Sequence, residues 1–403
     1  MAKAVVPVAI NQDLKALLPA DGIEPGYVIG IMHWLEQTLL HRCAKSGTTV
    51  RNINFPEFLK FKVPLAPGNE QRRIVAKIEA LTARSARAKE ALDAIPGLLE
   101  RYRQSVLAAA FRGDLTADWR TQNPNLVRGS DLVERAKLEK GLQPKRATRH
   151  AVAQQRAQET LYHQIPASWA TCQIGDVARL QPGYAFKSSW FTQQGVRLLR
   201  GTNLEPGAAR WENTVHLSND RAEEFAEYRL APGDIVIAMD RPVISGGLKI
   251  AILAESDLPA LLLQRVGRFL PTGALDKTFL WQFLQSSNFL GHIQDQATGT
   301  QLPHISANDI ETVLMPMPPL EEQREIVVQI AGALRALSGV SQAIQDASKR
   351  LGALNQAILA KAFRGELVPQ DPNDEPASVL LARIKGERAA AGGPGRRRSR
   401  RAS

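Results

Sequence analysis

The chain has 403 residues, enough for two or three domains, and its composition of 44% hydrophobic and 23% charged residues is that of a soluble protein with packed cores. Its net charge of +11 is concentrated in two places: residues 383–403 carry eight Lys or Arg against one Glu, and residues 137–156 carry six against one. Because the positive charge lies in a tail and a linker, it does not by itself make the folded body a nucleic-acid binder.

The sequence shows neither a secretion signal nor a membrane span. Met1–Ile10 lacks the basic-then-apolar layout of a signal peptide, and we find no run of about 18 apolar residues. The two cysteines, Cys43 and Cys172, lie far apart without a CxxC context. This usage is typical of reduced, buried thiols, so we expect a cytoplasmic protein.

A segment in the first part of the chain returns 252 residues later. Residues 64–75 read PLAPGNEQRRIV, and residues 316–327 read PMPPLEEQREIV. The same offset, without a gap, relates Ala110–Gly113 to Ala362–Gly365, which both read AFRG. Two copies of one long unit predict a pseudo-twofold molecule, which suits a bipartite target such as DNA.

The residues before the first copy resemble the end of the domain that precedes the second copy. Val5–Asn54 aligns there, and Gly26–Leu40 matches Lys277–Gln296, which we predict to be a helix. Nothing on the N-terminal side corresponds to residues 166–256. Relative to its internal symmetry, we therefore expect the sequence to lack roughly 100 or more residues.

Each copy contains a long helix with apolar residues in a 4-3 spacing, which is the condition for a coiled coil. In the first copy these positions are Ile74, Ile78, Leu81, Ser85, Ala88, Leu92, Ile95, Leu99, Tyr102 and Val106. In the second copy they are Ile326, Ile330, Ala333, Leu337, Val340, Ile344, Ala347, Leu351, Leu354 and Ile358. An amphipathic helix on a globular core, the alternative, has a wider apolar stripe. We expect the two helices, each spanning roughly 50 Å, to pair antiparallel, with Pro96 kinking or restarting the first.

Both helices are followed by similar sequences. Gly113 and Gly365 suit C-terminal caps, and a weaker repeat after each cap predicts a short extra helix. Residues 114–165 form a basic helical connector. Residues 385–403 form a basic tail that we expect to be disordered and able to contact phosphates non-specifically.

The segment between the helices, about residues 166–315, is predicted to be a mixed domain. Its strand candidates are Val196–Leu199, Asp234–Met239 and Lys249–Leu253, separated by Gly/Pro turns. The predicted class is α+β: a mixed α+β domain flanked by two long helices that form an antiparallel coiled coil. The predicted boundaries are 1–63 for the incomplete first domain, 64–113 and 316–384 for the two helical regions, 114–165 for the connector, 166–315 for the complete domain and 385–403 for the tail.

These landmarks, in this order and duplicated, resemble the specificity subunit of type I restriction-modification systems. The residues that carry the resemblance are Pro316–Gln323, Ile305–Ser306 with Asp309–Ile310, Ala362–Leu367, Gly183–Ser188, Leu199–Asn203 and Gly233–Val236. The resemblance covers about residues 5–384 and includes an N-terminally incomplete first target-recognition domain. It implies a cytoplasmic DNA-binding protein of phage defence, in which each recognition domain reads half of a split site.

The resemblance also implies partners and a division of labour. The coiled coil would fix the gap between half-sites and dock methyltransferase subunits, and restriction subunits would join them. S-adenosylmethionine, ATP and Mg would be bound by those partners and not by this chain, which we expect to be no enzyme. A complete reader of the first half-site would have to come from a second polypeptide or from sequence ahead of Met1.

The residues themselves give no catalytic signature. We find no methyltransferase tetrad, no phosphate-binding glycine loop and no metal-ligand spacing among the histidines. Base reading needs Arg, Lys, Asn or Gln on turns of the mixed domain. The candidates are Lys187, Arg200, Asn203, Arg241, Lys249, Gln301 and His304.

Each candidate has a structural alternative. Arg200 and Asn203 could satisfy a turn, Arg241 could pair with Asp240 or Asp234, and Gln301 and His304 could pack on the coiled coil. Two other functions also stay open: a coiled-coil scaffold whose middle domain binds protein, and an enzyme with an unrecognised active site.

Overall fold

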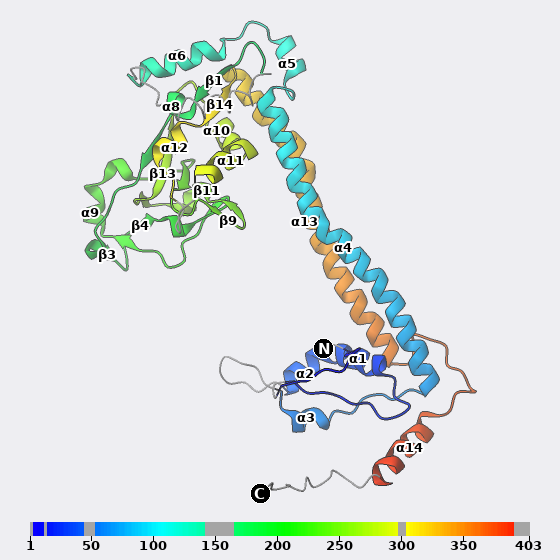
Figure 1. Ribbon diagram of the computed structural model, residues 1–403. Coiled ribbons are helices and arrows are strands. Elements are labelled where there is room, and N and C mark those ends of the chain that lie inside the picture. The colour runs from blue at the N-terminus through cyan, green and yellow to red at the C-terminus, as the bar shows by residue number, and fades with distance from the viewer. Residues whose placement is uncertain (1–2, 12–13, 44–52, 142–164, 297–303, 391–403) are drawn as a thin grey trace. The chain divides into compact units, whose positions relative to one another are not determined.

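The computed structural model describes residues 3–11, 14–43, 53–141, 165–296 and 304–390 (Figure 1). The chain divides into two compact units, Met1–Pro96 with Gly339–Ser403 as unit 1 and Gly97–Ser338 as unit 2. Two long helices, α4 (Gly68–Arg112) and α13 (Leu320–Phe363), each pass from one unit into the other. Each unit therefore contains the start of one long helix and the end of the other.

The two long helices run antiparallel, as the repeat predicts. In unit 1 the first turns of α4 share a hydrophobic core with the last turns of α13, through Ile74 and Phe363. In unit 2 the last turns of α4 share a core with the first turns of α13, through Phe111 and Ile326. The start of each long helix therefore packs against the end of the other, so the two helices run in opposite directions.

Only part of the predicted apolar stripe of each helix is buried. The ten strongest seam positions, Ile74, Ile78, Leu81, Leu92, Leu99, Ile326, Ile330, Leu337, Ile344 and Leu351, are buried or half-buried. Tyr102, Val340 and Leu354, which share the predicted spacing, are exposed. A straight helix of 3.6 residues per turn drifts off a 3.5-residue stripe, so some stripe positions rotate out of the seam.

Pro96 does not restart the first helix. α4 continues through it for 45 residues, about 67 Å at 1.5 Å per residue, and is longer than the predicted stripe. The ring of Pro96 is exposed, so it clashes with no core residue, and the helix is held by packing on both sides of it. Of the two predicted effects of Pro96, the restart is therefore wrong, and the kink stays a prediction.

The predicted glycine caps are confirmed. Gly113 and Gly365 have φ of 86° and 76°, the left-handed conformation that glycine adopts at low cost. After Gly113 the Asp114 N–H donates to the Ala109 carbonyl, and after Gly365 the Glu366 N–H donates to the Lys361 carbonyl, both at 2.9 Å. The two ends share one capping geometry at the 252-residue offset.

The short helices after the caps are also present. They are α5 (Ala117–Gln122) and α6 (Gly129–Glu139) in unit 2, and α14 (Ala377–Ala390) in unit 1. Leu132 of α6 and Leu380 of α14 are both buried and occupy equivalent places in the weaker repeat. Because α14 continues to Ala390, the tail begins later than predicted; residues 391–403 lie outside the described residues.

In its described part before α4, unit 1 also contains the short helices α1 (Pro25–Trp34), α2 (Glu36–Cys43) and α3 (Phe55–Leu59). Tyr27 and Ile31 of α1 are buried with the ends of α4 and α13. Its N-terminal residues 3–11 and 14–20 belong to no helix or strand.

Unit 2 contains the mixed domain. Its helices are α8 (Ile174–Val177), α9 (Asn219–Glu223), α10 (Lys277–Leu284), α11 (Ser287–Gln296) and α12 (Ala307–Glu311). Its strands are β1 (Ala170–Gln173), β2 (Ala178–Pro182), β3 (Phe191–Thr192), β4 (Val196–Leu199), β5 (Leu204–Glu205), β6 (Ala208–Ala209), β7 (His216–Leu217), β8 (Ile235–Ala238), β9 (Val243–Ile244), β10 (Gly247–Leu248), β11 (Ile250–Ile252), β12 (Ala260–Leu262), β13 (Val266–Pro271) and β14 (Leu314–Met317). Short 3-10 turns cover Ser188–Trp190, Gly201–Asn203, Ala226–Tyr228 and Glu255–Asp257.

Two four-stranded sheets organise this domain. The first has the order β11-β8-β13-β2 and is antiparallel; the second has the order β12-β4-β7-β3 and contains one parallel pair, β12 with β4. β1 and β14 form a separate antiparallel pair, as do β9 with β10 and β5 with β6. The three predicted strands are confirmed as β4, β8 and β11.

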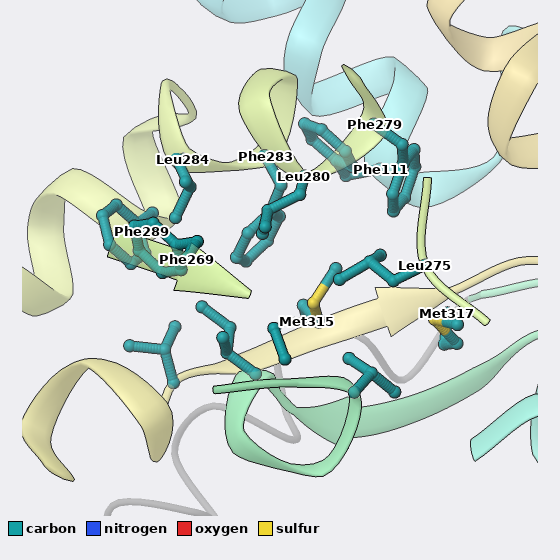
Figure 2. Close-up of a cluster of buried hydrophobic side chains, with 14 of the residues drawn as sticks. Phe111, Phe269, Leu275, Phe279, Leu280, Phe283, Leu284, Phe289, Met315 and Met317 are labelled. Carbon is teal, nitrogen blue, oxygen red and sulfur yellow. The ribbon is translucent and has the colours of Figure 1, made fainter. Parts of the chain in front are cut away.

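Strand β8 of the first sheet is buried on both faces, which explains its unbroken apolar sequence. Ile235 and Ile237 face the large core that also holds the helices, while Val236 and Ala238 face a second core with residues of β4 and β12. Figure 2 shows the large core, where Phe279 and Phe283 of α10 surround Phe111 at the end of α4. Strands buried on both faces read as continuous apolar runs, so the alternation typical of a surface strand is missing here.

The helix predicted over Lys277–Gln296 is two helices, α10 and α11. The break falls at Gln285–Ser286, and the Ser286 hydroxyl accepts a hydrogen bond from the Phe289 N–H at 3.3 Å. Serine competes for backbone donors in this way and starts a new helix. The equivalent segment of unit 1 is also broken, at Leu35 between α1 and α2, within two residues of the equivalent position.

The internal repeat extends to individual contacts. Gln71 and Gln323 are both fully buried, and each side-chain carbonyl accepts from a backbone N–H, of Glu24 at 2.9 Å and of Asp276 at 2.8 Å. Residues 24 and 276 are themselves 252 apart. The edge-to-face ring contact of Phe111 with Phe279 likewise has its counterpart in Phe363 with Tyr27, at 5.5 and 5.3 Å between centroids. The duplication is therefore structural as well as sequential.

Length and composition alone would allow α13 to cross a membrane, contrary to our expectation that no segment would. Among the described residues it is the helix that passes this test, and only 12% of the apolar window is buried. A single such window is weak support for a span, because long helices of soluble proteins meet the same criterion. Both ends of α13 lie in the cores of folded units, so we assign it to the coiled coil.

Candidate nucleic-acid interface

Three neighbouring strands of the first sheet bring polar residues together at one end of the sheet, where β8 ends and β11 and β13 begin. β8 runs antiparallel to both β11 and β13, with Ile237 opposite Ile250 and Ala238 opposite Val266. The residues after β8 therefore meet those before β11 and β13. These are Asp240, Arg241, Lys249 and Arg265, and His304 joins them by a β-bridge to Asp240. We call these five residues the Asp240 cluster.

Asp240 holds two of the cluster's side chains. Arg265 donates from Nη1 to one carboxylate oxygen at 2.6 Å, and the His304 Nδ1 lies 2.7 Å from the other. An ionised carboxylate can only accept, so Nδ1 donates and Nε2 is the ring nitrogen available to other groups. The side chains of Arg265 and His304 are 63% and 51% exposed. Both present hydrogen-bonding atoms to solvent from a fixed position.

The charge state of Asp240 follows from its neighbours. Partial burial disfavours the carboxylate, but hydrogen bonds and positive charge from Arg265 and His304 outweigh it and lower the pKa of Asp240. At neutral pH the carboxylate is therefore ionised and orients the two basic side chains.

Arg241 adjoins this arrangement in an unusual backbone conformation. Its φ is 43°, and that of Arg265 is 66°, in the left-handed region that side chains other than Asn and Asp rarely adopt. Arg241 is exposed, and neither Asp240 nor Asp234 pairs with it among the described residues: Asp240 is held by Arg265, and Asp234 by Arg268 and Lys277. Left-handed residues of this kind cluster at functional sites, where the surrounding structure maintains them.

Lys249 lies at the same end of the sheet but points inward. It is 9% exposed, and its ammonium donates to the Gly201 carbonyl at 3.0 Å. Burial lowers the pKa of Lys249, partly opposed by the charge of Asp240. Lys249 thus ties the turn after β4 to the Asp240 cluster.

Arg200 and Asn203 satisfy that turn, which is the structural alternative the sequence left open. Asn203 is 1% exposed; its Oδ1 accepts from the Arg200 backbone N–H at 3.3 Å, and its Nδ2 donates to the Arg210 carbonyl at 2.9 Å. The Arg200 guanidinium donates to the Asn213 carbonyl. Their contacts give Asn203 no free polar group for a base.

The two remaining candidates lie elsewhere or cannot be placed. Lys187 is exposed and its ammonium lies 5.4 Å from the centre of the Trp190 ring, beside the second sheet. Gln301 lies outside the described residues. The structure therefore brings Arg241, Lys249 and His304 together and leaves Lys187 apart.

Arg265 is a site residue that the sequence reasoning missed. It follows Leu263–Gln264 in what reads as an ordinary strand end, and its side chain reaches Asp240 because β8 pairs with β13. The register that joins the two strands could not be read from either sequence alone, so the sequence carried no signal for this contact.

The described residues offer no group of three or more His, Cys, Asp or Glu side chains able to hold a metal ion. Cys172 is fully buried, and burial raises its pKa well above the usual value, so its thiol stays protonated. The chemistry at hand is hydrogen bonding by exposed Arg and His, which suits recognition of guanine edges and phosphates.

Comparison with known proteins gives this site a context. Residues 166–331 match the family described as the type I restriction modification DNA specificity domain. The chain is 34% identical over 281 residues to the type I restriction enzyme EcoAI specificity subunit of Escherichia coli, covering 68% of this chain and 46% of that protein. It is 27% identical over 372 residues to the EcoDI specificity subunit of Escherichia coli, covering 90% of this chain and 77% of that one. Residues 166–331 belong to this specificity-domain family, and the chain as a whole is similar to type I restriction enzyme specificity subunits.

The coverage of the relatives is uneven. The match to the EcoAI specificity subunit, like that to the MjaVIII specificity subunit of Methanocaldococcus jannaschii, spans 46% of the relative, about half its length. A solved structure, described as the structural basis of complex assembly and conformational transition of the type I R-M system, superposes with a TM-score of 0.57 over 85% of this chain and 72% of its own. At 20% identity that likeness establishes the shared fold. The Asp240 cluster lies within the matched specificity domain.

Proposed function

We propose that this chain is the DNA-reading subunit of a type I restriction-modification complex and that unit 2 reads one half of a bipartite site. The observation that carries the proposal is the Asp240 cluster. One carboxylate orients two exposed basic side chains within the matched specificity domain, next to an exposed arginine. Arg recognises guanine through paired donors, and a guanidinium held in place loses less entropy on binding.

The slightly acidic balance of the mixed domain supports a local contact surface over a broad basic one. Segment 166–314 holds twelve Lys or Arg against fifteen Asp or Glu. Such a surface gives sequence discrimination but little phosphate affinity of its own. In the proposed complex, methyltransferase subunits docked on the coiled coil supply much of the phosphate grip, and restriction subunits join them.

Catalysis is assigned to those partners. Methyl transfer with S-adenosylmethionine, and ATP- and Mg-dependent cleavage, would take place on the methyltransferase and restriction subunits, while this chain selects the sequence. The proposal predicts that the chain alone transfers no methyl group and cuts no DNA; either activity in a preparation free of partners would contradict it.

The reading role is tested by DNA binding of the chain together with its methyltransferase partner. We expect the wild type to protect one defined sequence in a footprint, and Arg265→Ala to weaken binding to that sequence by about 5- to 150-fold, as expected for the loss of about 1–3 kcal/mol. Non-specific binding should change little. Arg112→Ala is the matched control, because Arg112 is also an exposed arginine paired with a carboxylate but lies outside the matched domain.

Asp240→Ala separates orientation from direct contact. Because Asp240 itself repels DNA phosphates, a cluster with no reading role would bind equally well or better without it. We expect the variant to bind the specific site more weakly and to relax base preference, because Arg265 and His304 lose their common anchor. Unchanged specificity in both variants would remove the cluster from the reading surface.

A further inference from the structure

The connection between β8 and β11 is a short β-ribbon with a residue of the Asp240 cluster on each side: Arg241 precedes it and Lys249 follows it. The Lys249 N–H donates to the Pro242 carbonyl at 2.7 Å and closes the base of the ribbon. Beyond this bond β9 and β10 pair antiparallel. The ribbon therefore starts from the end of the sheet at which the cluster lies. The major groove of B-DNA is wide enough to admit such a two-stranded ribbon.

The two faces of the ribbon differ. Val243 and Leu248 lie opposite each other, and both pack in or against the large hydrophobic core. Successive residues of a strand point to opposite faces, so Ile244 faces away from that core. Its partner across the ribbon is Gly247, which has no side chain to cover it. Ile244 is 40% exposed, and both residues of the turn that follows it are exposed as well. The ribbon is thus anchored by one face and leaves an apolar side chain in solvent on the other.

The surroundings of Ile244 distinguish it from a scattered surface residue. The ribbon residues 242–248 carry no charge, while Arg241, Arg265 and His304 are exposed in the cluster from which the ribbon starts. An apolar side chain beside several hydrogen-bond donors suits an anionic partner that also presents apolar groups. DNA is such a partner, because its major groove presents the 5-methyl group of thymine next to the hydrogen-bonding edges of the bases.

We propose that the β9–β10 ribbon enters the major groove and that Ile244 contacts the 5-methyl group of a thymine in the recognised half-site. The Asp240 cluster distinguishes bases by their hydrogen-bonding groups, whereas Ile244 distinguishes thymine by its methyl group alone. Because isoleucine is branched at Cβ and stiff at χ1, little side-chain freedom is lost on contact. The inference rests on the proposed function and adds to it a residue that determines specificity.

The opposite end of β11 supplies a matched control. Ile252 is 39% exposed, almost the same fraction as Ile244, and is also a strand residue. It lies opposite Ile235 at the start of β8, whereas the Asp240 cluster follows the end of β8. Ile252→Ala therefore removes the same atoms from an equally exposed position away from the cluster, and we expect it to leave DNA reading unchanged.

The test measures binding of the chain with its methyltransferase partner to the unmethylated sequence that it protects. Replacing each thymine in turn by uracil removes the methyl group and keeps every hydrogen-bonding group of the base. We expect one replacement to weaken wild-type binding about fourfold, as for the exposure of one buried methyl group. Ile244→Ala should bind the thymine and uracil duplexes equally at that position, while Ile252→Ala keeps the fourfold difference. Protection of the same sequence by both variants shows that they fold.

The outcomes separate this contact from the proposed function. If the wild type protects no defined sequence, the proposed function fails and the contact with it. If it protects one, but no thymine there is sensitive to loss of its methyl group, only the contact is overturned. A sensitivity that persists in Ile244→Ala, or that is lost in Ile252→Ala as well, also overturns it. So does release of the methyltransferase partner by Ile244→Ala, since Ile244 would then contact protein.

Discussion

His292 illustrates how a single residue couples unit 2 to pH. It lies half-buried on α11, and its Nε2 is 3.1 Å from the Asp309 carbonyl at α12. Burial disfavours the imidazolium and lowers the pKa of His292, despite the hydrogen bond and the nearby carboxylates of Asp309 and Asp295. The folded protein therefore holds this side chain neutral at a pH where the unfolded chain, with a pKa of about 6.5, takes up a proton.

The sign of the effect follows from this difference. Because the unfolded state binds more protons, we expect stability to fall as pH drops below about 6.5, with a slope of at most about 1.4 kcal/mol per pH unit, and to level off below the folded pKa. His292→Gln keeps a donor for the Asp309 carbonyl but does not titrate. Hydrogen exchange of α11 between pH 7 and 5, corrected for the intrinsic rate, should lose this dependence in the variant; an unchanged profile would assign it to other groups.

At the scale of elements, two buried glutamines join the long helices to the segments before α1 and α10. Gln323 accepts from the Asp276 N–H and donates to the carbonyls of Ala274 and Pro318, at 2.8, 3.1 and 3.0 Å. We expect Gln323→Ala and Gln71→Ala each to destabilise their own unit by about 1–3 kcal/mol for each buried group left unpaired. Gln329→Ala, at an exposed position of α13, should change stability by less than about 0.5 kcal/mol in chemical unfolding.

The two helix caps offer a second comparison at this scale. Alanine at Gly113 or Gly365 is strained by the positive φ, at a cost of about 1–2 kcal/mol. A Cβ on Gly113 would also lie 2.6 Å from the Pro166 ring, whereas one on Gly365 would meet only the flexible end of Gln370 at 3.3 Å. Gly113→Ala should therefore lower the midpoint of unfolding more than Gly365→Ala; equal effects would show that the ring moves freely.

The sequence predicts those elements that depend on neighbouring residues in the chain, and it misses those that depend on contacts between distant segments. The two long helices, their caps, the short helices after the caps and strands β4, β8 and β11 follow from local patterns, because apolar spacing and glycine act within a few residues. The break at Ser286 and the continuity through Pro96 were missed, because packing on neighbouring elements decides them. The Asp240 cluster needed the pairing of β8 with β13, so the sequence suggested Arg241 and His304 but not Arg265.

At the scale of the whole molecule, the duplication accounts for most of the organisation. Each unit combines the start of one long helix, the end of the other and a short helix after the cap, and among the described residues only unit 2 adds a complete sheet domain. Under the proposed function, this sheet domain is the one complete reader among the described residues. This predicts that unit 2 alone determines one half of the recognised sequence.

The most direct measurement is the set of methylated motifs in the DNA of a host that carries this chain with its methyltransferase partner. Sequencing of modified bases should give one defined motif for the wild type, and Arg265→Ala should lose or relax base preference within one half of it while Arg112→Ala leaves it unchanged. A motif that is identical in all three strains, or methylation that persists without this chain, would contradict the account that unit 2 reads DNA through the Asp240 cluster.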